Sequence, residues 1–194
     1  MPNFTRDWFS EAIGIFDFYL KDFKGRDNLN FCEIGSFEGR SALWFLENIL
    51  TGKNSTILCV DSFGGSDHLN ALKIDIRGAE QRIKENLQPY VGKFRIMKGL
   101  SQVILRNPEF INKFDVIYVD GSHEGSDTLE DMVISYRNLK EGGLMFMDDY
   151  LWNSNAKPLQ NTPKMAIDSF TNCFKDKMKI KEFTYKTVIL EKII

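Results

Sequence analysis

One short stretch near the start of the chain, residues 31–41 (FCEIGSFEGRS), constrains its fold more than any other. A short apolar run leads into Gly35 and Gly39, and a helical pattern, residues 42–46 (ALWFL), follows at once. Glycine is required where the backbone turns with positive φ or approaches a ligand without a Cβ in the way. The order of strand, tight turn and helix N-terminus is typical of the corner at which α/β folds bind nucleotides.

The charge of this turn limits which kind of nucleotide it can bind. Dinucleotide-binding turns usually carry three glycines spaced G-x-G-x-x-G and bind a pyrophosphate, whereas this turn reads E-x-G-x-x-x-G. Glu33, at the end of the first strand, would repel a pyrophosphate. It suits a cofactor with a positive centre, such as S-adenosylmethionine (SAM), which has a sulfonium and an α-amino group. The free N–H groups at the start of the next helix favour a carboxylate or phosphate beside Ser41.

Strand and helix patterns alternate beyond this corner, with a turn expected at Gly142 and Gly143. The expected strands are residues 31–34, 57–60, 94–97, 114–120 and 144–147, and the helices between them are residues 42–50, 71–87, 101–107 and 126–139. Five repeats of this alternation predict a parallel sheet with right-handed crossovers.

The last segment breaks the alternation. Residues 165–174 predict a helix, and residues 178–183 and 187–194 predict two strands that suit an antiparallel edge pair. The predicted fold class is therefore α/β: a Rossmann-like, doubly wound, mostly parallel seven-stranded sheet with an antiparallel C-terminal edge hairpin.

A single domain is expected over residues 1–194, because the chain is long enough for one full core. We divide it into an N-terminal helical extension (1–29), a segment with the cofactor and metal motifs (30–150), and a lid loop, helix and edge strands (151–194).

Composition excludes several classes of function. The net charge is −2 and no dense run of Lys and Arg occurs, so we expect no nucleic-acid partner. Charged residues interrupt the apolar residues of the first 23 positions, so neither a signal peptide nor a membrane segment is expected. The three cysteines, Cys32, Cys59 and Cys173, lack C-x-x-C spacing and indicate no disulfide framework or zinc site. We therefore expect a cytoplasmic protein.

Acidic side chains dominate the carboxyl ends of the expected strands, where open α/β sheets bind ligands. Asp61 follows the second strand, roughly 20 to 30 residues beyond the glycine turn, where dinucleotide-binding folds place the acid that binds ribose hydroxyls. The alternative is an Asx turn that stabilises its own loop. The residues at these strand ends are Glu33, Asp61, Ser101, Asp120, Asp148 and Asp149.

Asp120, Asp148 and Asp149 form a second acidic group, at the ends of consecutive strands. Like charges in one cleft raise each other's pKa values unless a cation joins them. Mg²⁺ or Mn²⁺ would resolve the repulsion and orient a hydroxyl substrate. The alternative is that one aspartate binds loop backbone while the others are solvated. Because adjacent residues of a strand point in opposite directions, Asp148 and Asp149 can both be ligands only if the strand has ended.

His123 follows Asp120 by three residues and can accept a proton from a hydroxyl, so we predict it as a general base, with a loop hydrogen bond as the alternative. His68 is a weaker candidate on the substrate side. Three further acidic residues, Asp127, Glu130 and Asp131, are explained by the dipole of their helix.

Over residues 30–150, these motifs resemble class I SAM-dependent methyltransferases, and in particular the metal-dependent catechol-type O-methyltransferases. The sequence is closer still to small bacterial and viral-type enzymes that methylate sugar hydroxyls, through D-G-S-H and G-G-x-x-x-x-D-D. The resemblance implies a metal site at Asp120, Asp148 and Asp149 and a catalytic role for His123 and Asp120, with His123 in place of the family's lysine base. The cofactor-binding residues that it implies are Glu33, Gly35, Ser36, Phe37, Gly39, Ser41, Asp61, Ser62, Gly99, Ser101, Gln102 and Asp120.

The expected function is SAM-dependent methyl transfer to a hydroxyl of a small molecule, a sugar or glycan, with Mg²⁺ or Mn²⁺ assisting. Three alternatives stay open: a catechol-like or phenolic acceptor, a nucleotide-dependent oxidoreductase, and a SAM-binding module without catalysis. We expect no membrane partner. The sequence leaves the oligomeric state open, a homodimer included.

Overall fold

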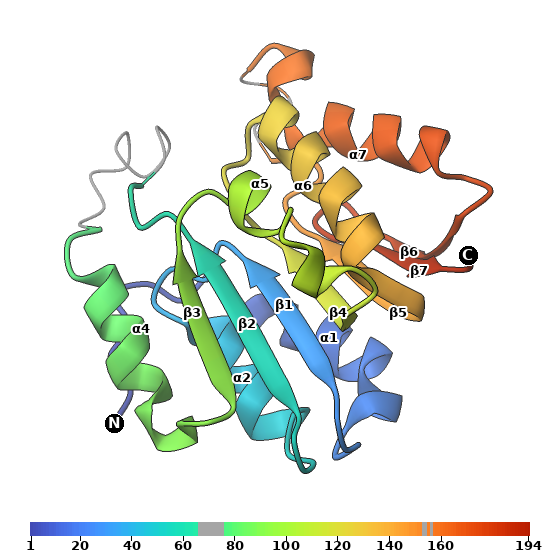
Figure 1. Ribbon diagram of the computed structural model, residues 1–194. Helices are drawn as coiled ribbons and strands as arrows, with labels where there is room; N and C mark the ends of the chain where they lie inside the picture. The colour runs from blue at the N-terminus through green and yellow to red at the C-terminus, as the bar shows by residue number, and fades with distance from the viewer. Residues whose placement is uncertain (66–75, 153–154, 156) are drawn as a thin grey trace.

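Seven strands form one sheet at the centre of the molecule, and helices cover both of its faces (Figure 1). In this computed structural model, which describes residues 1–65, 76–152, 155 and 157–194, the strand order is β3-β2-β1-β4-β5-β7-β6. The strands are β1 (Asn30–Ile34), β2 (Thr56–Asp61), β3 (Phe94–Lys98), β4 (Phe114–Val119), β5 (Leu139–Met147), β6 (Met178–Phe183) and β7 (Val188–Lys192).

Strands β1 to β5 pair in parallel, and β7 pairs antiparallel with both β5 and β6. The predicted mixed sheet with a C-terminal edge hairpin is confirmed. Strand β1 lies between β2 and β4, with Cys32 opposite Leu58 on one side and Ile117 on the other. This central position explains why the residues Phe31, Cys32, Glu33 and Ile34 are all buried.

Each face of the sheet has its own apolar core. On one face, Phe16 and Phe45 pack with Phe146 and Tyr118 beneath α1 (Ile13–Tyr19), α2 (Arg40–Asn48) and α4 (Ala79–Leu87). The other face packs against α5 (Ser101–Ile104), α6 (Gly125–Asn138) and α7 (Pro163–Cys173). The short 3₁₀ helices are η1 (Ser10–Ala12), η2 (Lys21–Phe23), η3 (Gln88–Tyr90), η4 (Pro108–Phe110) and η5 (Leu159–Asn161).

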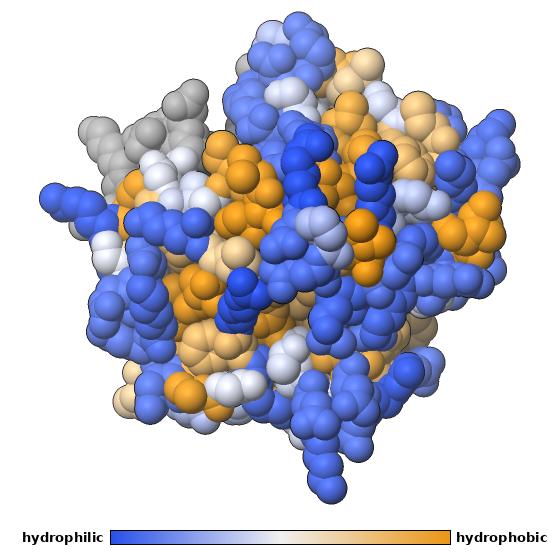
Figure 2. Space-filling model, viewed as in Figure 1, coloured by the Kyte–Doolittle hydropathy of each residue, from blue (hydrophilic) through white to orange (hydrophobic). Residues whose placement is uncertain are grey.

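The helical layer is thin over β2 and β3, because α5 has only four residues. Figure 2 shows apolar residues at the surface in this region of the molecule. Leu100 and Val103, in and beside α5, are among the exposed apolar residues. No helix among the described residues is both long enough and apolar enough to span a membrane.

The structure differs from the expected elements in two places. The N-terminal helical extension is divided into η1, α1 and η2 rather than one helix. The turn expected at Gly142 and Gly143 lies inside β5, where Gly142 has a φ of +73° and the pairing with β4 shifts register between Phe114 and Val116. The two glycines therefore lie in a β-bulge, and the strand continues beyond them. His68 and the expected helical residues 71–75 lie outside the described residues.

Candidate functional site

The loops that leave the parallel strands are unusual in backbone conformation. A non-glycine residue with positive φ is uncommon, yet four such loops contain one: Phe37 after β1, Phe63 after β2, His123 after β4 and Asp149 after β5. At the opposite edge of the sheet the positive-φ residues are asparagines, which tolerate this conformation. Strained backbone of this kind gathers at functional sites.

A pocket opens among these loops, at the carboxyl ends of β1 to β4. Nine of the predicted site residues line it: Gly35, Phe37, Asp61, Ser62, Gly99, Ser101, Gln102, Asp120 and His123. Four more, Glu33, Ser36, Gly39 and Ser41, lie in or beside the turn between β1 and α2, outside this lining. The sequence therefore named nine of the twenty-one lining residues, some through the placement of ligands at strand ends and the others through the family resemblance.

Gly35 and Gly39 both have the positive φ that the sequence analysis expected, and both lie close to other atoms of the protein. Gly35 has a φ of +88°, and a Cβ on it would lie 1.7 Å from the backbone oxygen of Asp120. Gly39 has a φ of +78° and is the N-cap of α2, where a Cβ would lie 2.7 Å from Ile83. The turn can pack against β4 and α4 only because both positions lack a side chain.

Glu33 lies under the turn and is fully buried. The Ser41 hydroxyl donates a hydrogen bond to Glu33 Oε1. Among the described residues, neither Glu33 Oε2 nor the buried Ser36 Oγ has a hydrogen-bond partner. Burial raises the pKa of Glu33 to about 7 against the opposing effect of the neighbouring Ser41 and Ser36 hydroxyls. Buried polar atoms without partners are costly, so this pair fits a ligand that brings hydrogen-bond donors, such as an ammonium group.

Asp61 forms the Asx turn that the sequence left as one alternative, and ribose binding, the other alternative, stays a prediction. Its Oδ1 accepts a hydrogen bond from Phe63 N–H and its Oδ2 accepts one from Phe37 N–H, both at 2.7 Å. The first bond is an Asx turn, and the second ties the β1 and β2 loops together. Burial raises the pKa of Asp61 despite these bonds. Each oxygen keeps a second lone pair, so Asp61, which lines the pocket, can still accept hydrogen bonds from ribose hydroxyls.

At one end of the pocket, His123 lies between two carboxylates. Its Nε2 is 3.3 Å from Asp120 Oδ1 and 2.9 Å from Asp149 Oδ2. Burial alone would lower the pKa of His123, but its hydrogen bonds to Asp120 and Asp149 raise it to about 10. The imidazolium therefore acts as the counter-ion of the two aspartates.

The same three residues fit a divalent cation. Asp120, His123 and Asp149 each offer one ligand atom, and these atoms lie within 4.8 Å of one another. Two carboxylate oxygens and an imidazole nitrogen are donors that Mn²⁺ accepts readily, and Mg²⁺ uses carboxylates together with water. The expected trio included Asp148 instead of His123.

Asp148 has other partners. It is buried, and its oxygens accept hydrogen bonds from Tyr118 Oη at 2.7 Å and Thr187 Oγ1 at 2.9 Å. Burial and the charges of Asp120 and Asp149 raise the pKa of Asp148 to about 6. Strand β5 ends at Met147, so the condition for both aspartates to face the site is met, but the two carboxylates make different contacts. Asp148 remains a predicted ligand.

The pocket also contains residues to which the sequence analysis gave no binding role. Asp131 of α6 is only 2% exposed and accepts a 2.6 Å hydrogen bond from Ser101 Oγ. Its signal was present in the sequence: with Thr128, Ser135 and Asn138 it lies on the buried face of α6, where an aspartate needs a partner. Trp8 joins the pocket through tertiary packing alone, with its ring 5.4 Å from that of Phe37.

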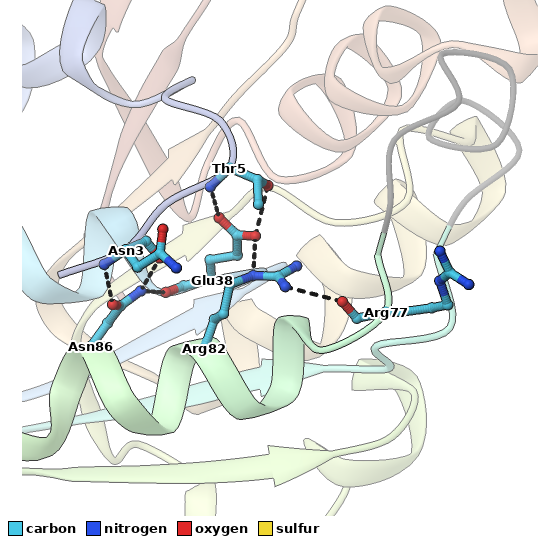
Figure 3. Close-up of polar contacts among 6 residues, drawn as sticks. All are labelled: Asn3, Thr5, Glu38, Arg77, Arg82 and Asn86. Atoms are coloured by element: carbon cyan, nitrogen blue, oxygen red, sulfur yellow. Dashed lines mark hydrogen bonds and ion pairs between the residues drawn. The ribbon is translucent and has the colours of Figure 1, made fainter.

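The buried Glu38 fixes the N-terminal segment beside the pocket (Figure 3). Its carboxylate accepts hydrogen bonds from Thr5 N–H at 2.6 Å, Thr5 Oγ1 at 2.7 Å and Arg82 Nε at 2.5 Å. Asn86, also on α4, binds the backbone of both Asn3 and Glu38. The glycine turn, α4 and the segment that carries Trp8 are therefore one hydrogen-bonded unit.

Comparisons with known proteins agree with this geometry. An O-methyltransferase from Bacillus cereus in complex with S-adenosylhomocysteine (SAH) has a TM-score of 0.68 at 12% identity, over 98% of this chain and 84% of that one. The MycE methyltransferase of the mycinamycin biosynthetic pathway, in complex with Mg and SAH, has a TM-score of 0.63 at 16% identity, over 98% and 51% of the two chains. Both likenesses concern the fold.

Sequence comparison identifies the family. Uncharacterized protein R132 of Acanthamoeba polyphaga mimivirus is 25% identical over 144 residues, which are 70% of this chain, and this chain spans 59% of that relative's length. A family model described as "Methyltransferase domain" matches residues 32–150, the segment that holds the glycine turn, Asp61 and the Asp120 to Asp149 cluster. The chain therefore belongs to the methyltransferase family that this model describes, in agreement with the resemblance of its motifs.

Proposed function

We propose that this protein is an O-methyltransferase that moves the methyl group of SAM to a hydroxyl oxygen of a small molecule. One observation carries the proposal: Asp120 and His123 line the same pocket as Gly35 and Asp61. A group able to receive a hydroxyl proton therefore stands in the pocket formed by the cofactor turn. A pyrophosphate-binding oxidoreductase would not place a buried, partly unpaired Glu33 under that turn.

The cofactor is proposed to lie along the strand ends. Glu33 Oε2 and Ser36 Oγ receive the α-amino group, because both are buried and lack partners among the described residues. Asp61 accepts hydrogen bonds from the ribose hydroxyls. The adenine lies by the loop from Gly99 to Gln102, and the sulfonium lies toward Asp120.

The reaction breaks the bond between the methyl carbon and the sulfonium sulfur and forms a bond between that carbon and the acceptor oxygen. Because the sulfur leaves as neutral SAH, catalysis depends on alignment and on the nucleophilicity of the oxygen. His123 Nε2 takes the hydroxyl proton. Asp120 and Asp149 orient the imidazole through the contacts at 3.3 and 2.9 Å.

Divalent-metal assistance belongs to this proposal. With a pKa of about 10, His123 is protonated at neutral pH and cannot act as a base. Asp120 and Asp149 would hold the cation, together with Asp148 as the sequence predicted; His123 would then serve as the base and not as a ligand, because one imidazole nitrogen cannot bind a cation and accept a proton at once. Neutralising the two carboxylates removes the charges that raise the pKa of His123. When bound, the cation supplies a Lewis acid that lowers the pKa of a coordinated hydroxyl.

For the acceptor we infer a sugar or glycan hydroxyl, in line with the resemblance of the D-G-S-H and G-G-x-x-x-x-D-D motifs. Trp152 supports an acceptor with a flat face, because its ring lies 5.0 Å from that of His123. The apolar face of a sugar ring and the ring of a catechol both suit that surface. A vicinal diol in either compound offers two oxygens to a metal ion.

The test is methyl transfer from labelled SAM to panels of sugars, glycosides and catechols, with Mg²⁺ or Mn²⁺ and with EDTA. The proposal expects labelled sugar product that EDTA suppresses. His123→Ala should abolish most turnover, by roughly 10²-fold or more, and leave SAH affinity within about twofold of the wild-type value. Unchanged turnover in this variant would remove His123 as the base. Labelled catechol without labelled sugar would correct the acceptor class.

A further inference from the structure

Asp131 is a buried carboxyl in the cofactor pocket that the proposed mechanism does not use. It lies on the buried face of α6, is 2% exposed, and lines the pocket together with Ser101, Gln102 and Gly121. This is the part of the pocket where the proposed function places the adenine, away from the β1 turn where Glu33 lies.

The two oxygens of Asp131 have different surroundings. Ser101 Oγ donates a hydrogen bond to Oδ1 at 2.6 Å, which fixes the carboxyl plane. Among the described residues, no hydrogen bond reaches Oδ2. Gly121, in the loop after β4, leaves the space beside Oδ2 open, because a Cβ at that position would lie only 3.3 Å from it. The pocket therefore has access to an acceptor atom with an unused lone pair.

The charges around Asp131 define what it can bind. Burial, opposed by the Ser101 hydrogen bond and assisted by the charges of Asp127 and Glu130, raises the pKa of Asp131 to about 7. Above that pH Asp131 is a carboxylate that only accepts hydrogen bonds, so an anionic or purely accepting group, such as a phosphate or a carbonyl oxygen, would face repulsion there. A neutral N–H donor would satisfy the free oxygen without adding charge.

We propose that Asp131 Oδ2 accepts a hydrogen bond from the exocyclic amino group of the cofactor's adenine, so that Asp131 determines selection of a 6-amino purine over a 6-oxo purine. The proposal rests on the proposed SAM-binding function. Ser101 is its positioning residue, because its hydroxyl holds Oδ1 and so directs Oδ2 into the pocket.

The experiment compares two ligands that differ only along the six-membered edge of the base: SAH, with a 6-amino group and an N1 acceptor, and S-inosylhomocysteine, with a 6-oxo group and an N1–H. Both are titrated calorimetrically at pH 8, where Asp131 is ionised, into the wild type, Asp131→Asn and Glu130→Gln. Glu130 is the matched control, because it lies next to Asp131 on α6 and pairs with Arg106 outside the pocket. Asn has the size of Asp and offers either an oxygen or an N–H to the base.

The expected results are a wild-type preference for SAH of about tenfold or more, the value of one well-placed hydrogen bond, and an unchanged preference in Glu130→Gln. In Asp131→Asn the preference should fall to within about threefold. Ser101→Ala keeps the carboxyl and should give an intermediate preference. Circular dichroism melting of each variant shows whether it is folded at the titration temperature.

Two results would overturn the inference. If the wild type binds both ligands equally, no residue of the pocket recognises the amino group. If Asp131→Asn keeps the wild-type preference, another residue recognises the amino group. If Asp131→Asn is unfolded, the same conclusion follows from Ser101→Ala with the wild-type preference. A wild type that binds neither ligand would contradict the proposed SAM-binding function itself, and this inference with it.

Discussion

Gly35 lies where the glycine turn packs against the loop after β4, so Gly35→Ala should reduce both the stability of the fold and the affinity for the cofactor. The new Cβ would lie 1.7 Å from the Asp120 carbonyl oxygen, where real contacts exceed 3 Å. Gly35 also has a φ of +88°, a conformation that costs a residue with a side chain roughly 1–2 kcal/mol. The clash adds to this cost, because β1 must separate from the loop after β4. We expect a total loss of about 3–5 kcal/mol in the free energy of unfolding.

Gly92→Ala is the matched control, since Gly92 has nearly the same φ, +92°, with nothing within 4 Å of the added Cβ. It should lose only the roughly 1–2 kcal/mol that the positive φ costs. Urea unfolding gives both free energies, and SAH titration shows the functional effect, which should be at least tenfold weaker binding in Gly35→Ala and none in Gly92→Ala. Equal losses of stability in the two variants would refute the reasoning, because the difference isolates the contact with Asp120.

Three further predictions concern the buried carboxyls. Glu33 has a pKa of about 7, which a bound ammonium group would lower, so SAH binding at pH 6.5 should release about half a proton or more. Calorimetry in buffers of different ionisation enthalpy measures this release, and a binding enthalpy that does not depend on the buffer would contradict the prediction. Asp131 has a pKa near 7 in the folded state and 3.8 as its ordinary value, so the folded protein holds a proton that the unfolded chain has lost between about pH 4 and 7. Stability should therefore fall as pH rises through this window, and Asp131→Asn should reduce the fall between pH 5 and 7.5 by about 2.5 kcal/mol at most, measured by urea unfolding at the two pH values; an identical fall in both proteins would count against it. Glu38→Gln should weaken the contacts to Thr5 and Arg82 and speed trypsin cleavage after the exposed Arg6, with cleavage at the wild-type rate as the opposing result.

The fold was predictable from the sequence because its signals are local. Apolar runs as short as the one in β1 mark strands that are buried on both faces, and glycines with obligatory positive φ mark the turn that follows. Asp61 was found by its distance along the chain from Gly35, a spacing that the βαβ unit fixes. The edge hairpin followed from the change in pattern after residue 163.

The contacts within the site were less predictable, because they depend on side-chain direction at the point where regular structure ends. Asp148 and Asp149 are adjacent, yet the positive φ of Asp149 directs its carboxylate to His123 while Asp148 binds Tyr118 and Thr187. Asp131 was attributed to the helix dipole, since no local pattern reveals that α6 brings it to Ser101. Such pairings need the tertiary structure.

Binding of SAH tests the central claim most directly. Purified protein is titrated calorimetrically with SAH, with and without Mg²⁺, and with NADH as the control nucleotide. We predict saturable 1:1 binding of SAH, weakened at least tenfold in Asp61→Ala, and no heat from NADH. Heat from NADH and none from SAH would contradict the assignment and leave Glu33 as an ordinary buried acid at the end of β1.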